Sequence, residues 1–228
     1  MLRRVLWLLA AAVVCGTTGV ALASPQFAST VALTYSSKDP GSPSGFDSFA
    51  TFSDPGEPSG KPKELFRIRV GFHPGTRIDT AALPRCRASD TDVQRLGLHA
   101  CPASTRLGIV HAQGLISTGA RFNPVGHLFN ARRAIIVVVT VDGRYITSFR
   151  DDLTRDTLTV NFRIPPGISL IRFKPHIPRH FRKLAGKRRA YMRTPPSCPA
   201  TEVWTTTVLF SYRDGSTQQL SATTPCRR

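Results

Sequence analysis

Short apolar runs separated by turn-forming residues are the feature that most constrains how this chain can fold. Runs of β-branched and aromatic residues recur along it, divided by Pro, Gly, Asn and Asp, and no stretch after residue 23 keeps the apolar period of an amphipathic helix. Such runs are typical of strands. We expect strands at residues 29–36, 46–52, 64–72, 107–112, 126–130, 134–141, 144–149, 157–163, 169–173, 201–212 and 216–224.

The segment from residue 134 to 149 predicts a hairpin that lies between two packed layers. Asp142-Gly143 stands between apolar runs, where glycine supplies the positive φ of a tight turn, and Asp214-Gly215 repeats the pattern. Both faces of the first hairpin are apolar: Ile136, Val138, Tyr145 and Phe149 are expected on one face, and Ile135, Val137, Val139 and Ile146 on the other. The predicted fold class is therefore all-β, a disulfide-bonded β-sandwich of jelly-roll or immunoglobulin-like type, with about 10–12 strands and long irregular loops.

The N-terminus has the pattern of a secretory signal peptide. Arg3 and Arg4 precede an apolar run from Val5 to Cys15, and Ala-Leu-Ala at 21–23 provides a small-residue cleavage site. We expect cleavage near Ala23, export, and a mature protein that is secreted or held at the cell surface without a transmembrane span. An uncleaved anchor is the alternative, because the apolar stretch approaches the length that crosses a bilayer.

Four cysteines follow the predicted cleavage site: Cys86, Cys101, Cys198 and Cys226. An even number in an exported chain predicts two disulfides, and sequence alone leaves every connectivity open. Pairing neighbours along the chain closes the smallest loops, so we favour Cys86–Cys101 and Cys198–Cys226, each stabilising the fold by roughly 2–4 kcal/mol. Zinc is the poorer alternative, because the cysteines lack Cys-x-x-Cys spacing.

Residues 24–228 are expected to form a single β-sandwich domain with three distinctive regions. Residues 38–63 are rich in Pro and Gly and contain the sequence Asp-Pro-Gly-x-Pro-Ser-Gly twice, which predicts surface turns in preference to a calcium site. Residues 74–107 form an irregular loop that the first disulfide would pin, with a short helix at 90–96 capped by Ser89. The third region is the basic segment, residues 172–193.

No arrangement of residues predicts catalysis, a metal or a cofactor. The two Gly-x-Pro-Ser-Gly sequences have proline where a nucleophile elbow needs serine. Asp151, Asp152 and Asp156 are expected to be solvated in a turn. His176 and His180 have the spacing of helical metal ligands, but a proline lies between them. We therefore expect a protein that is not an enzyme; a secreted hydrolase of glycan or ester bonds is the alternative.

Charge is the strongest functional signal in the chain. Lys and Arg outnumber Asp and Glu by 31 to 14, a net charge of +17, and loss of the two arginines of the signal peptide leaves +15. The basic segment contains no acid and interleaves aromatic residues with cations, so we expect it to bind anionic envelope polymers or acidic glycans. Export argues against nucleic acid as the main partner, and a merely solvated face is the alternative. The candidate residues are Arg172, Lys174, Arg179, Arg182, Lys183, Lys187, Arg188, Arg189 and Arg193.

The sequences around the cysteines form a set of motifs. They are Leu83-Pro-x-Cys86, Ala100-Cys-Pro-Ala-Ser104, Pro195-Pro-Ser-Cys-Pro199, Trp204, Tyr212-Arg-Asp-Gly215 and Thr224-Pro-Cys226. This set resembles that of uncharacterised secreted β-rich proteins of actinobacteria. The resemblance implies an exported, disulfide-bonded, β-rich protein, and it carries over no catalytic residue, ligand or substrate. Taken with the charge pattern, it favours an exported, non-enzymatic protein that contacts the cell envelope.

Overall fold

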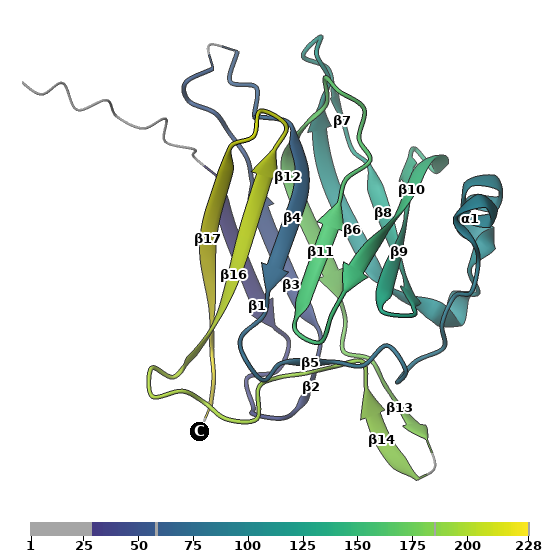
Figure 1. Ribbon diagram of the computed structural model, residues 1–228, viewed down its shortest axis with the longest axis vertical. Coiled ribbons are helices and arrows are strands. Elements are labelled where there is room, and N and C mark those ends of the chain that lie inside the picture. Colours follow the sequence, from purple (N-terminus) through teal and green to yellow (C-terminus); the bar gives the residue numbers. More distant parts are fainter. Residues whose placement is uncertain (1–28, 58, 185, 228) are drawn as a thin grey trace, which may run out of the picture.

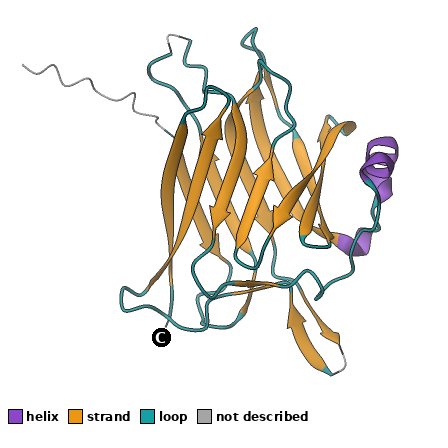
Figure 2. Cartoon of the chain, in the orientation of Figure 1, coloured by secondary structure: helices purple, strands orange, loops and turns teal. Residues whose placement is uncertain are grey.

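Antiparallel strands make up most of the computed structural model, which describes residues 29–57, 59–184 and 186–227 (Figures 1 and 2). The predicted signal peptide, residues 1–23, lies outside the described residues. Every predicted strand segment is confirmed, several with longer ends. The corresponding strands are β1 (Thr30–Tyr35), β3 (Phe46–Thr51), β4 (Leu65–Gly71), β6 (Arg106–Leu115), β8 (Val125–Ala131), β9 (Ala134–Val141), β10 (Arg144–Leu153), β11 (Thr157–Asn161), β12 (Ser169–Ile177), β16 (Val203–Tyr212) and β17 (Thr217–Pro225).

These strands and the short β7 (Arg121–Phe122) form one 12-stranded sheet that curls nearly closed. Its order is β1-β3-β12-β6-β8-β9-β10-β11-β4-β16-β17, with β7 paired to β6. The edge strands β1 and β17 lie side by side (Figure 1), and the Thr224 hydroxyl joins them by donating to the Leu33 carbonyl at 3.0 Å. The two halves of this near-barrel pack face to face around one core, which confirms the all-β, sandwich-class prediction.

Two small sheets lie at one end of the barrel (Figure 1). The first is three-stranded, and the second is a two-stranded hairpin that projects from the barrel. The sequence patterns do not predict them, because such short strands show no measurable alternation. Their strands are β2 (Pro43–Ser44), β15 (Met192–Arg193) and β5 (Arg77–Ile78) in the first sheet, and β13 (Phe181–Leu184) and β14 (Lys187–Ala190) in the second.

The β9–β10 hairpin lies between two layers, as its apolar faces predict. Its turn residues Asp142 and Gly143 have φ of 49° and 76°, the positive values that a two-residue hairpin turn needs. The prediction that Phe149 shares a face with Ile136 and Val138 is wrong. A β-bulge between Tyr145 and Thr147 shifts the register by one residue, so Phe149 pairs with Val137 and faces the barrel interior.

A second apolar cluster covers the outer face of β9. Ile136 and Val138 pack there against Val93 of α1 (Asp90–Leu96) and against the Cys86–Cys101 disulfide. The predicted helix and its cap are confirmed: Ser89 Oγ accepts the Asp92 N–H, and the Ser89 N–H donates to the Asp92 carboxylate, both at 3.1 Å. Short 3₁₀ turns at Gly97–Ala100 and Ala103–Thr105 lead back into β6. The outer face of β9 is apolar like its inner face, so the segment that carries α1 and the first disulfide shields it from solvent.

Both disulfides join neighbouring cysteines, which confirms the favoured pairing. Cys86 and Cys101 have Cα atoms 5.1 Å apart, and Cys198 and Cys226 have theirs 5.9 Å apart. The first pins the segment that carries α1, and the second ties the chain before β16 to the end of β17. Both bridges are therefore structural.

Aromatic residues fill one end of the barrel interior. The Tyr35 and Trp204 rings meet edge to face with centroids 5.6 Å apart, and the Phe46 and Phe72 rings lie at the same separation. Trp204 is fully buried and donates its indole N–H to the Ser197 carbonyl at 3.0 Å. These residues close this end of the barrel.

One buried hydroxyl gives a stability prediction. Tyr191 is 2% exposed, and its hydroxyl has no hydrogen-bond partner among the described residues. Tyr191→Phe is therefore expected to raise the free energy of unfolding by about 1 kcal/mol in urea denaturation. The matched variant is Tyr35→Phe, which removes a hydroxyl bonded to Thr76 Oγ1 at 3.0 Å and should lower it by a similar amount. Equal effects of the two variants would contradict the prediction.

Candidate functional site: an apolar cavity in the barrel

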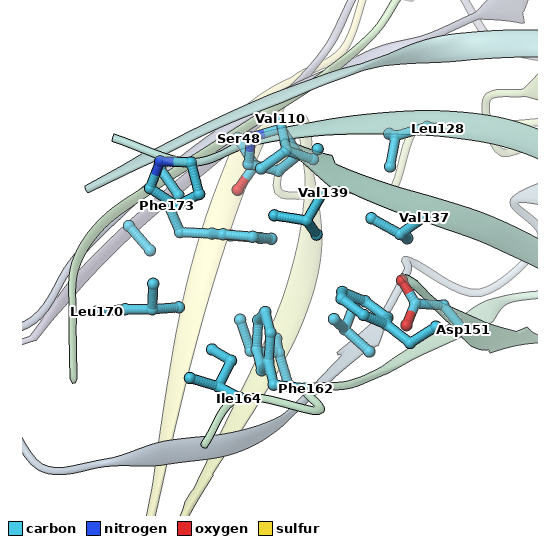
Figure 3. Close-up of a pocket in the computed structure, with 18 of the residues that line it drawn as sticks. Ser48, Val110, Leu128, Val137, Val139, Asp151, Phe162, Ile164, Leu170 and Phe173 are labelled. Carbon is cyan, nitrogen blue, oxygen red and sulfur yellow. The ribbon is translucent and has the colours of Figure 1, made fainter. Parts of the chain in front are cut away.

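The barrel interior contains a cavity of about 320 Å³ (Figure 3). Strands from both halves of the sheet line it, and most of its wall is made of Val, Leu, Ile and Phe side chains. The polar residues on the wall are Ser48, Thr147, Asp151 and Arg163. A concave, mostly apolar space with a few polar groups is typical of a small-molecule binding site.

Small residues at inward-facing positions create this space. Ala50 of β3, Ala112 of β6 and Gly126 of β8 all line the cavity. A Cβ on Gly126 would lie 3.3 Å from Val110 Cβ and 3.4 Å from the nearest Val137 methyl, so even alanine would narrow this part of the wall. The aromatic residues at the closed end occupy the corresponding space there. The cavity therefore follows from where the sequence puts small and large residues.

The cavity opens at the end of the barrel opposite the aromatic cluster. Lining residues deep in the barrel are buried: Leu128 is 5% exposed and Ile135 is 3% exposed. Beside the β9–β10 turn, Ile146 is 57% exposed although it also lines the cavity. Phe122 of β7 and Ile164, in the loop after β11, lie at the same end and are half-buried. This gradient of exposure places the mouth between the β9–β10 turn and these two residues.

Asp151 is the one buried acid on the cavity wall among the described residues. The prediction that Asp151 is solvated in a turn is wrong. β10 continues to Leu153 and places Asp151 on its inner face, where it is 3% exposed. Asp152, on the outer face, is exposed as predicted. Burial raises the pKa of the Asp151 carboxyl well above its usual value, and Asp152 raises it further, while a hydrogen bond from the Asn161 N–H opposes both.

The basic segment is divided among four places in the fold. Arg172 and Lys174 are exposed on β12, and Arg179 is exposed in the following link. Arg193 is half-buried and structural, since it donates to the Gly41 and Arg188 carbonyls at 2.9 and 3.2 Å. The structure brings the other candidates together, all exposed, on the β13–β14 hairpin: Arg182, Lys183, Lys187, Arg188 and Arg189.

This hairpin places like charges directly opposite one another. Arg182 pairs with Arg189 and Lys183 pairs with Arg188, and such pairs destabilise a two-stranded sheet. On one face the Arg188 guanidinium lies 3.5 Å from the centroid of the exposed Phe181 ring. The base of the hairpin is held by the Tyr191 N–H, which donates to the His180 carbonyl at 3.0 Å.

The remaining candidates have structural contacts. His176 pairs with Asp47 through Nδ1 at 2.6 Å, and His180 Nε2 lies 2.7 Å from the Leu107 carbonyl oxygen. In the described ranges no three His, Cys, Asp or Glu side chains group as metal ligands. No helix within the described part of the chain is long and apolar enough to cross a membrane.

No protein-family model, curated protein sequence or solved structure matches the chain. The resemblance to secreted actinobacterial proteins therefore depends on the cysteine motifs alone. The cavity is the feature that sequence reasoning missed, because it arises only when separate strands curl around one another.

Proposed function

We propose that the protein is an exported, non-enzymatic binding protein that takes an apolar small molecule into the barrel interior. The observation that carries the proposal is the 320 Å³ apolar cavity with its mouth at one end of the barrel. The two disulfides are consistent with export.

The packing free energy associated with the cavity supports a binding role. Protein interiors are close-packed, and voids much larger than a water molecule are few. Apolar atoms that fill this space would make the van der Waals contacts that the lining side chains lack. A ligand that fills the cavity is therefore expected to stabilise the fold as well as to bind.

Binding of prodan, a small neutral dye whose emission shifts to the blue in apolar surroundings, tests the proposal. We expect saturable binding of one dye per chain. Ala112→Phe places a ring in the cavity and should weaken binding about tenfold or more. His111→Phe places a phenyl ring one residue earlier on β6, where the side chain is exposed, and it should leave binding unchanged. Equal binding by the two variants, or none by the native protein, would overturn the proposal.

A hydrolase in the same cavity would need a second acid, or a Ser–His pair, facing Asp151. Asp152 follows it in β10 but lies on the opposite face and is exposed. The carboxyl on the wall therefore stands among apolar side chains, which suits binding better than hydrolysis.

A second candidate function is contact with anionic cell-envelope polymers through the β13–β14 hairpin. The like-charged cross-strand pairs favour it, because an anionic partner lying across them would relieve their repulsion. The binding surface would be the exposed cations of the hairpin, with Arg172 and Lys174 of the barrel wall as further contacts.

Charge reversal separates binding from folding in this hairpin. Arg182→Glu places a carboxylate opposite Arg189, so the hairpin should become more stable while retention on heparin falls to a lower salt concentration. Arg69→Glu, an exposed arginine on β4, makes the same change in net charge and is the control. Equal retention of the two variants would show that net charge alone is responsible.

A further inference from the structure

Asp151 lies at the point where β10 and β11 stop pairing. β10 and β11 pair at Asp152–Thr159 and Leu153–Leu158 and then diverge. Beyond that point the Asn161 N–H donates to Asp151 Oδ1 at 3.3 Å in place of a backbone carbonyl. The Asp151 side chain thus lies where β10 and β11 are no longer hydrogen-bonded to each other, and it borders the cavity (Figure 3).

No cation of the described residues neutralises this carboxyl. No Lys, Arg or His nitrogen among them lies within 4.0 Å of its oxygens. Arg163 also lines the cavity, but it is exposed and forms no ion pair with Asp151. Buried carboxyls are rarely left without a partner, because moving a charge out of water is costly. In an otherwise apolar cavity, an unneutralised acid points to a partner that arrives with the ligand.

Three aromatic rings also line the cavity. The Phe149 and Phe162 rings have centroids 6.1 Å apart, and Phe162 meets Phe173 at 5.6 Å. Phe162 directly follows Asn161, which donates to the Asp151 carboxylate. Phe149 lies two residues before Asp151 on the inner face of β10, and Figure 3 shows Phe162 and Phe173 on other parts of the cavity wall. A cavity that holds both aromatic rings and a carboxyl suits an ammonium group, because the ring faces attract cations.

We propose that the cavity binds an apolar molecule with an amino head group, and that Asp151 holds the ammonium while the aliphatic wall holds the apolar part. This inference rests on the proposed function and names the ligand class. An ammonium beside Asp151 would stabilise the ionised form of its carboxyl, whereas a carboxylate or phosphate head would place a second acidic group beside it in a buried site and should bind more weakly.

Displacement of prodan by eight-carbon ligands tests the proposal at neutral pH. Octylamine, octanol and octanoate share one chain and differ in their head groups. Octylamine should displace prodan at concentrations about tenfold or more below those of octanol, with octanoate the weakest of the three. Asp151→Asn should abolish the advantage of octylamine over octanol, measured within that variant. Asp152→Asn is the matched control and should keep it.

Each outcome is decisive for one of the two proposals. If native protein binds prodan but octylamine is no better than octanol, the amino head group is wrong while the apolar site stands. The same holds if the advantage of octylamine survives in Asp151→Asn. If prodan itself does not bind, the proposed function fails, and the head-group proposal fails with it.

Discussion

Replacing Asp151 with asparagine is expected to raise the free energy of unfolding at neutral pH, and the gain should disappear in acid. Burial raises the pKa of this carboxyl well above its ordinary 3.8, so the folded protein holds a proton that the unfolded chain has released. Native stability should therefore fall by about 1.4 kcal/mol for each pH unit between the unfolded and folded pKa values. Asparagine keeps the shape, and its Oδ1 can still accept the Asn161 N–H.

Urea denaturation of both proteins at pH values from about 3 to 8, on either side of the ordinary pKa of an aspartate, measures this difference. The two free energies should converge at the acidic end, where the carboxyl is protonated in both states, and separate as the pH rises. Asp152→Asn leaves Asp151 buried and removes only the smaller contribution of this exposed neighbour to its pKa, so the divergence should be much smaller than that of Asp151→Asn. A constant difference between Asp151→Asn and native protein across the range would contradict the burial of this acid.

Loss of the Cys86–Cys101 disulfide should have the second large effect. The bridge closes a loop with a sequence separation of 15 and pins the segment that covers β9. Replacing both cysteines with serine should lower the free energy of unfolding by about 3 kcal/mol. It should also increase binding of the dye ANS to the native state, because Ile136 and Val138 lose part of their cover.

The second disulfide provides the comparison. Replacing Cys198 and Cys226 with serine opens a loop with a separation of 28 but leaves the cover of β9 in place. This variant should also be less stable, without the increase in ANS binding. Equal ANS binding by the two variants would show that the first disulfide does not hold the cover.

The long strands and the disulfides are predictable from sequence because their signals are local. Alternating apolar residues between turn residues mark β9, and Asp142-Gly143 marks its turn. Ser89 and Asp92 mark the start of α1 in the same way. Strands such as β2 and β15 are too short for a pattern, and they form because distant segments meet at the end of the barrel.

The candidate site could not be predicted from local sequence patterns, because it depends on a β-bulge in β10. The bulge between Tyr145 and Thr147 changes the face on which every later residue of β10 lies, so Phe149 and Asp151 turn inward. The sequence does contain one signal: Phe149, Asp151 and Leu153 alternate as a continued strand would. Sequence alone predicts that a polar residue such as Asp151 faces solvent. That prediction changes only when the residues on the other face of the strand are known to be the exposed ones.

Methyl NMR of the native protein titrated with prodan tests most directly whether the barrel interior is the binding site. Along β9, Ile135, Val137 and Val139 line the cavity, whereas Ile136 and Val138 pack in the outer cluster. We expect chemical-shift changes to alternate along the strand, large at the first three residues and small at the other two. Changes of equal size on both faces, or changes confined to the outer cluster, would contradict the account.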